Sequence, residues 1–104
     1  MHTDIAEKHD ALAALCRRYG VARLEVFGSA ARSVGFDPSR SDADFLVTFT
    51  PAARNDLAAF ADFKDALESV LKRPVDLVER EAIEASRNFI RRRRILKEAE
   101  AVYG

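Results

Sequence analysis

Short runs of β-forming residues alternate with longer helical patterns along the whole chain, and no other feature limits the possible folds as strongly. Strands are expected at residues 21–27, 42–49 and 75–78, each bounded by Gly, Pro or other turn-forming residues. Apolar residues spaced by three and four predict helices before, between and after these strands. The order α-β-α-β-α-β-α therefore predicts an α/β (α+β) fold, in which helices flank a small sheet of at least three strands, and the pattern leaves open whether all strands are parallel.

The helices in the first half are bounded by residues that favour helix ends. Thr3 or Asp4 is expected to cap the first helix, which ends at Gly20 in a left-handed conformation. A short helical turn is expected at residues 30–34, after the first strand. The turn formers that follow predict a surface loop over residues 35–41.

Two further helical patterns occupy the second half of the chain. A cap at Asn55 or Asp56 begins a long helix that cannot continue past Pro74. Residues 80–102 are predicted to be mostly helical. The apolar positions expected to be buried are Leu57, Phe60, Phe63, Leu67, Val70 and Leu71 in the first of these helices, and Phe89, Leu96, Ala99 and Tyr103 in the second.

The composition is that of one small soluble domain spanning residues 1–104. Lys and Arg number 17 and Asp and Glu number 17, and this zero net charge argues against a broad nucleic-acid-binding surface. No stretch approaches the roughly 18 apolar residues of a membrane span. The N-terminus lacks a basic and apolar leader, so we expect a cytoplasmic protein. The only cysteine, Cys16, falls on the apolar stripe of the first helix, which predicts core packing.

Three aspartates fall on two of the predicted strands. Asp42 and Asp44 are two residues apart, so their side chains should project from one face with Cβ atoms about 6.6 Å apart. Asp76 lies among apolar residues, where a lone carboxylate is costly. If the third strand neighbours the second, the three carboxylates would gather and would repel one another without a divalent cation. Oxygen ligands with open positions suit Mg²⁺.

Gly28 and Ser29 stand where the first strand is predicted to turn into a helix. Glycine lets the backbone approach a phosphate group, and Ser29 offers an N–H and a hydroxyl. Arg32, one turn later, could add charge-assisted hydrogen bonds to the same phosphate, although a solvated helix arginine is equally expected. Each feature alone has an ordinary structural explanation. Together with the aspartates, they favour a site for a metal and a polyphosphate.

The same residues resemble a known signature. Residues 26–32 (Val-Phe-Gly-Ser-Ala-Ala-Arg) and the later Asp42 and Asp44 resemble the Gly-Ser…Asp-x-Asp motif of the DNA polymerase β-like nucleotidyltransferase superfamily. Residues 74–78 resemble its third-carboxylate strand. The short chain and its closing segment, residues 95–103, look like the minimal nucleotidyltransferase (MNT) branch. The resemblance covers nearly the whole chain and implies the polymerase β-like nucleotidyltransferase fold, with a small mixed sheet flanked by helices.

By this resemblance the chain would transfer a nucleoside monophosphate, foremost AMP from ATP, to a hydroxyl group. Asp42, Asp44 and Asp76 would be the catalytic and metal-binding residues, holding two Mg²⁺ ions. Gly28 and Ser29 would bind the triphosphate. The resemblance also implies that the acceptor is a partner toxin of the HEPN family and that this chain is its antitoxin.

Two other functions remain open at this stage. The chain could be a catalytically silent antitoxin that neutralises its partner by binding, or it could modify RNA or a small molecule. The run Arg91–Arg94 bears on the second alternative. Four consecutive helical residues fan over about 300°, so they cannot all meet one ligand. We therefore predict solvated or partner-facing arginines and no nucleic-acid site there.

Overall fold

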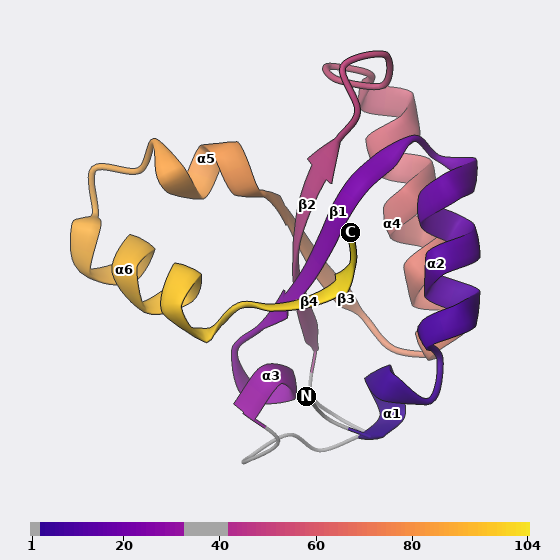
Figure 1. The fold of residues 1–104 in the computed structure, drawn as a ribbon, viewed down its shortest axis with the longest axis horizontal. Helices are drawn as coiled ribbons and strands as arrows, with labels where there is room; N and C mark the ends of the chain where they lie inside the picture. Colours follow the sequence, from indigo (N-terminus) through magenta and orange to yellow (C-terminus); the bar gives the residue numbers. More distant parts are fainter. Residues whose placement is uncertain (1–2, 33–41) are drawn as a thin grey trace.

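A four-stranded sheet forms the centre of the computed structural model, which describes residues 3–32 and 42–104 except the side chain of Arg32. The strands stand in the order β3-β2-β1-β4 (Figure 1). β2 and β3 are parallel, whereas β1 is antiparallel to both β2 and β4. The prediction of a mixed sheet is confirmed. The bounds are β1 (Val21–Phe27), β2 (Ala43–Phe49), β3 (Val75–Glu79) and β4 (Glu100–Tyr103).

Helices cover the two faces of the sheet unequally. On one face α2 and α4 pack side by side, and on the other α5 and α6 form an arm that extends away from the sheet (Figure 1). The helical bounds are α1 (Thr3–Ala6), α2 (His9–Arg18), α3 (Ser29–Arg32), α4 (Leu57–Leu71), α5 (Arg80–Glu84) and α6 (Phe89–Glu98). Within the described ranges, no helix combines the length and the apolar character needed to cross a membrane.

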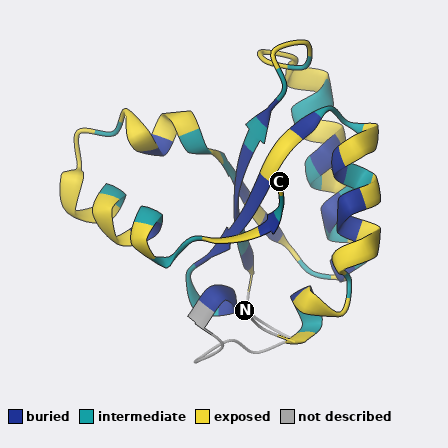
Figure 2. Cartoon of the chain, in the orientation of Figure 1, coloured by how far each residue is buried: buried dark blue, intermediate teal, exposed yellow. Residues whose placement is uncertain are grey.

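The alternation of side chains along the strands divides the core into two clusters. Phe45 belongs to the larger cluster, on the face covered by α2 and α4, where it is joined by Phe63. The next residue, Leu46, points to the opposite face and packs with Ile83 of α5 and Ile95 of α6 in the smaller cluster. Figure 2 shows exposed residues over most of α5 and α6. The second face of the sheet is therefore only partly covered.

The prediction of a mostly helical segment over residues 80–102 is wrong beyond Glu98. Glu100–Tyr103 forms β4, which pairs with β1. Without β4, β1 would be an edge strand with unpaired backbone N–H and C=O groups, and this tertiary pairing outweighs local helix propensity. Phe89 and Leu57, both predicted to be buried, are 63% and 83% exposed. Each is the first residue of its helix.

The other element boundaries follow the sequence more closely. The first helix is divided into α1 and α2, because a turn at Glu7 and Lys8 interrupts it, and Gly20 has the expected positive φ of 70°. The Asp56 carboxylate accepts a hydrogen bond of 3.0 Å from the N–H of Ala59 and so caps α4. The helical turn predicted at residues 30–34 is α3 as far as the structure describes it. The remainder of that turn and the loop predicted over residues 35–41 lie outside the described residues.

Cys16 is fully buried in the larger cluster, as the apolar stripe predicts. Burial raises the pKa of its thiol from 9.0 to about 12, because desolvation disfavours the thiolate. At pH 8 the thiolate fraction accordingly falls from about one in ten to about one in ten thousand. We expect iodoacetamide to modify the native protein at least ~100-fold more slowly than the urea-unfolded protein. Equal rates for the two forms would contradict the burial of this side chain.

Candidate functional site

Asp44 and Asp76 lie side by side on neighbouring strands. The parallel register of β2 and β3 pairs Asp44 with Asp76, and the antiparallel register of β1 and β2 pairs Phe27 with Asp44. Directly paired residues project from the same face of a sheet, so both carboxylates lie on the face that α5 and α6 partly cover. Asp44 is half-buried and Asp76 is exposed. The adjacency on which the predicted carboxylate site depends is therefore present for this pair.

Gly28 allows the end of β1 to approach the Asp44 carboxylate closely. Its φ is +70°, in the left-handed region that disfavours residues with a Cβ. A Cβ built on Gly28 would lie 2.6 Å from Oδ2 of Asp44, which is too close for the carboxylate to keep its position. The Gly28 carbonyl also accepts a hydrogen bond of 3.1 Å from the N–H of Ala31. The glycine thus shapes the turn into α3 and leaves room for the carboxylate.

These residues line an open pocket of about 400 Å³. One wall comes from the sheet and from the turn at Gly28 and Ser29, and the opposite wall comes from α6. The lining residues are Phe27, Gly28, Ser29, Asp44, Asp76, Arg91, Arg94, Ile95 and Glu98. Clefts of about 300–1,000 Å³ are typical of small-molecule sites. The structure therefore brings four of the six predicted site residues to one pocket.

The other two predicted residues are not placed in this lining. Asp42 is exposed and immediately precedes β2, outside the set of residues that line the pocket. The side chain of Arg32 lies outside the described part of the structure. Among the described residues, no group of three His, Cys, Asp or Glu side chains is arranged to hold a metal ion. The catalytic, metal-binding and nucleotide-binding roles assigned to all six residues stay predictions.

The donor set that the pocket does present fits a divalent cation of the Mg²⁺ type. Asp44 and Asp76 offer carboxylate oxygens from paired positions, and the missing side chain of Gly28 leaves room beside Asp44. Mg²⁺ is commonly held by one or two carboxylates and completes its coordination with water and substrate phosphates. Two carboxylates at an open pocket meet this requirement.

Sequence reasoning missed the contribution of α6. Arg91 and Arg94 line the pocket, and Glu98 follows four residues after Arg94, so the three side chains recur at the spacing of one helix face. Arg93 is absent from this lining and lines a neighbouring surface pocket on the arm, which shares Arg94 with the first pocket. The spacing of three and then four residues from Arg91 through Arg94 to Glu98 was the available signal. This spacing alone could not assign the three residues to the pocket, because the sequence does not show which face of α6 meets the sheet.

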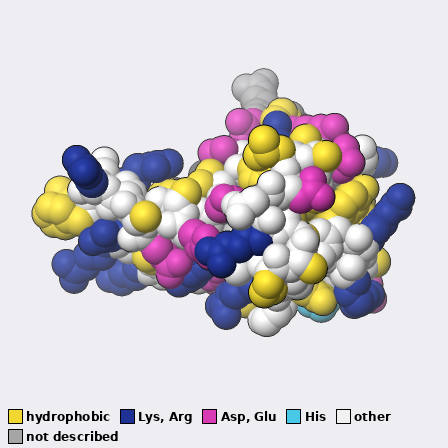
Figure 3. All heavy atoms as spheres, turned by 90° about the horizontal axis from the view of Figure 1, so that it is seen from above, with side chains coloured by type: hydrophobic (Ala, Val, Ile, Leu, Met, Phe, Trp, Pro, Cys, Tyr) yellow, Lys and Arg dark blue, Asp and Glu magenta, His cyan; other side chains and the backbone are white. Residues whose placement is uncertain are grey.

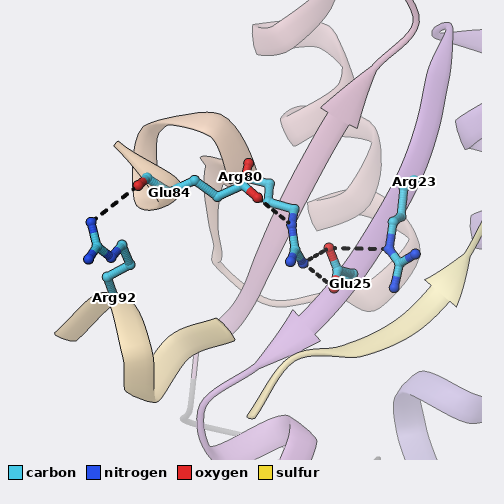
Figure 4. A network of polar contacts seen from close by, with 5 residues as sticks. All are labelled: Arg23, Glu25, Arg80, Glu84 and Arg92. Carbon is cyan, nitrogen blue, oxygen red and sulfur yellow. Dashed lines mark hydrogen bonds and ion pairs between the residues drawn. The ribbon is translucent and has the colours of Figure 1, made fainter. Parts of the chain in front are cut away.

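A buried ion pair attaches α5 to the sheet (Figure 4). Glu25 of β1 is 2% exposed, and Nη1 of Arg80 donates hydrogen bonds of 2.7 Å to both of its carboxylate oxygens. Arg23 lies 3.4 Å from the same carboxylate. The hydrogen bond with Glu25 raises the pKa of Arg80, so this guanidinium stays charged. The first residue of α5 is thereby fixed on the pocket face of the sheet.

A second set of contacts attaches α6 to α5. Nη1 of Arg92 donates hydrogen bonds to the carbonyl oxygens of Glu84 (3.4 Å) and Ser86 (3.0 Å). The Asn88 side chain caps α6 by accepting a hydrogen bond of 3.2 Å from the N–H of Arg91. Since Arg92 is held toward α5, its neighbours on the helix are rotated to other sides. This explains why Arg91 and Arg94 line the pocket.

Comparisons with known proteins identify a family whose activity fits a pocket of this kind. The family model described as "Nucleotidyltransferase domain" matches residues 9–102. A solved structure described as a minimal nucleotidyltransferase is 34% identical, covers 96% of this chain and 95% of its own, and has a TM-score of 0.72. No curated protein matches the sequence.

Two toxin–antitoxin structures share the fold at lower identity. One, a toxin–antitoxin with AMP-PNP, is 19% identical over 92% of this chain and 73% of its own, with a TM-score of 0.66. The other is a tri-AMPylated Shewanella oneidensis HEPN toxin in complex with its MNT antitoxin. It is 18% identical over 96% of this chain and 72% of its own, with a TM-score of 0.63.

Proposed function

The chain belongs to the nucleotidyltransferase domain family, and from this premise we propose that it transfers AMP from ATP to a hydroxyl group of a partner protein. We infer that the partner is a HEPN-type toxin and that the chain acts as its antitoxin. The fold shared with an MNT antitoxin in complex with an AMPylated HEPN toxin supports this choice of partner. The observation that carries the proposal is the pairing of Asp44 with Asp76 beside Gly28 on one pocket wall.

In the proposed reaction, the turn at Gly28 and Ser29 binds phosphate oxygens through backbone N–H groups and the serine hydroxyl. Asp44 and Asp76, with Asp42 as the predicted third ligand, would hold two Mg²⁺ ions. When bound, the metal neutralises charge on the triphosphate and stabilises the attacking and leaving oxygens. Arg32 is proposed as a further phosphate contact.

The transfer exchanges one phosphorus–oxygen bond for another. The acceptor oxygen forms a bond to the α-phosphorus, and the bond from the α-phosphorus to the oxygen that bridges to the β-phosphate breaks. Pyrophosphate leaves with the electron pair of that bond. The hydroxyl proton passes to the Asp76 carboxylate, which is exposed and can release it to water.

The test uses α-labelled ATP, Mg²⁺ and a HEPN-type toxin encoded beside this chain. We expect Asp44→Asn and Asp76→Asn each to lower label transfer about 10³-fold, because each removes a charged metal ligand. Asp62→Asn, an exposed substitution on α4, is the matched control and should transfer label at the wild-type rate. Transfer that survives Asp44→Asn unchanged would refute the assigned mechanism.

A catalytically silent antitoxin is the second candidate. The observation in its favour is that the described residues do not gather three acidic ligands. In that case toxin inhibition would be stoichiometric and independent of ATP, and Asp44→Asn would neutralise the toxin as well as wild type. Under the preferred function, the same variant loses neutralisation at substoichiometric amounts.

A further inference from the structure

We propose that Arg91 and Arg94 of α6 bind the β- and γ-phosphates of the nucleotide, so that the helix holds the pyrophosphate that leaves. This inference rests on the proposed function and deepens it, because the roles assigned above come from the sheet, the turn after β1 and α3, and none comes from α6. It also assigns a use to half of the arginine run that the sequence left unexplained.

The position of the two side chains is the first support. Both line the pocket on the wall opposite Asp44 and Asp76, and both are exposed. They are three residues apart on a ten-residue helix, so they lie one above the other on the same face. A ligand between the two walls would meet the carboxylates on one side and two guanidinium groups on the other.

Their lack of other partners is the second support. Arg80 is bonded to Glu25, Arg73 is paired with Asp4, and Arg92 is held by backbone carbonyls. Among the contacts found within residues 3–32 and 42–104, none joins the guanidinium of Arg91 or Arg94 to another side chain, and Arg91 takes part only through its backbone N–H. Two guanidinium groups that face a pocket and are not bonded to a carboxylate are available to an anionic ligand.

The two guanidinium groups of α6 favour a polyphosphate as that ligand, whereas the whole lining, with the carboxylates of Asp44, Asp76 and Glu98 against two arginines, has one net negative charge. The triphosphate of ATP carries about four negative charges, and the carboxylates of Asp44 and Asp76 repel it. Guanidinium groups match phosphate oxygens in a planar, two-point geometry, which a lysine cannot reproduce. Figure 3 shows Lys and Arg gathered over the arm formed by α5 and α6. Glu98 is the only acidic residue of α6 and lies at its last position.

The contacts that hold α6 supply the preorganisation that such a subsite needs. The Asn88 cap fixes the first turn, and the bonds from Arg92 to Glu84 and Ser86 fix its rotation relative to α5. The helix is therefore oriented without help from the nucleotide. Less ordering is then needed when the phosphates bind.

The test is isothermal titration of the whole chain with Mg²⁺ and three probes: inorganic tripolyphosphate, ATP and AMP. We expect the double variant Arg91→Gln/Arg94→Gln to weaken binding of tripolyphosphate and ATP by at least about 10-fold, and binding of AMP by less than about 2-fold. Arg93→Gln removes one charge from the same helix outside this pocket and should change none of the three. Each single variant should show part of the loss.

Each other outcome has a definite meaning. If the double variant binds ATP and tripolyphosphate as tightly as wild type, the phosphate role of α6 is wrong and the proposed function stands. If Arg93→Gln weakens binding of ATP and tripolyphosphate as much as the double variant does, the effect comes from the overall charge of the helix. That result would also overturn the inference. If wild type binds no ATP, both the inference and the proposed function fail. Far-ultraviolet circular dichroism checks that the exposed substitutions leave the fold intact.

Discussion

Replacing Gly28 by alanine is expected to lower the rate of nucleotidyl transfer at least about 100-fold, because the new Cβ displaces a carboxylate that must be accurately placed. That Cβ would lie 2.6 Å from Oδ2 of Asp44. The backbone φ of +70° adds a conformational cost of about 1–2 kcal/mol for alanine. The measurement is the rate of label transfer at saturating ATP, together with urea denaturation.

Gly20 provides the matched control for this substitution. It has the same φ of +70°, and a Cβ there would meet Ala53 at 2.8 Å, away from the pocket. Gly20→Ala should therefore lose a similar amount of stability and keep its transfer rate. Similar losses of rate in the two variants would show that Gly28 acts only through backbone strain and not through Asp44.

Replacing Arg80 by methionine is expected to lower the free energy of unfolding by about 3–5 kcal/mol, because it leaves the buried Glu25 carboxylate without its main partner. Arg23 remains at 3.4 Å, but its side chain is about half-exposed and is not hydrogen-bonded in the same way. Urea denaturation measures the change. Arg54→Met, which breaks an exposed ion pair with Glu81, should cost no more than about 1 kcal/mol.

The double variant Glu25→Leu/Arg80→Met separates the buried charge from the loss of packing. Since it removes both charges, it should recover most of the stability lost in Arg80→Met, to within about 1 kcal/mol of wild type. If Arg80→Met costs no more than Arg54→Met, the carboxylate does not depend on Arg80. If the double variant is no more stable than the single one, the arginine acts through packing.

The sheet wall of the pocket was largely predictable from sequence. Gly28 directly follows the first predicted strand and marks its end. Asp44 and Asp76 belong to short predicted strands whose other residues are mostly apolar. The step that required the structure was the adjacency of β2 and β3, from which the pairing of the two aspartates follows. Periodicity within each strand is local, and it carries no information about which strands are neighbours.

The α6 wall could not be predicted, because its position depends on contacts between distant segments. Glu25 and Arg80 are 55 residues apart in the chain, and their bond fixes α5 and, through it, α6. The same reason accounts for β4: Glu100–Tyr103 contains residues that also suit a helix, and its pairing with β1 decides its structure. The error at Phe89 has the same origin. Its spacing suits a buried helix position, but spacing does not show whether another segment packs there, and the side chain is 63% exposed.

The most direct test of the central claim is an anomalous-diffraction experiment on crystals grown with Mn²⁺ and a non-hydrolysable ATP analogue. We expect a metal peak about 2–2.3 Å from carboxylate oxygens of both Asp44 and Asp76, with the triphosphate between Ser29 and α6. A nucleotide bound instead in the separate pocket lined by Phe49, Leu57 and Phe60, with no metal at the two aspartates, would contradict the account.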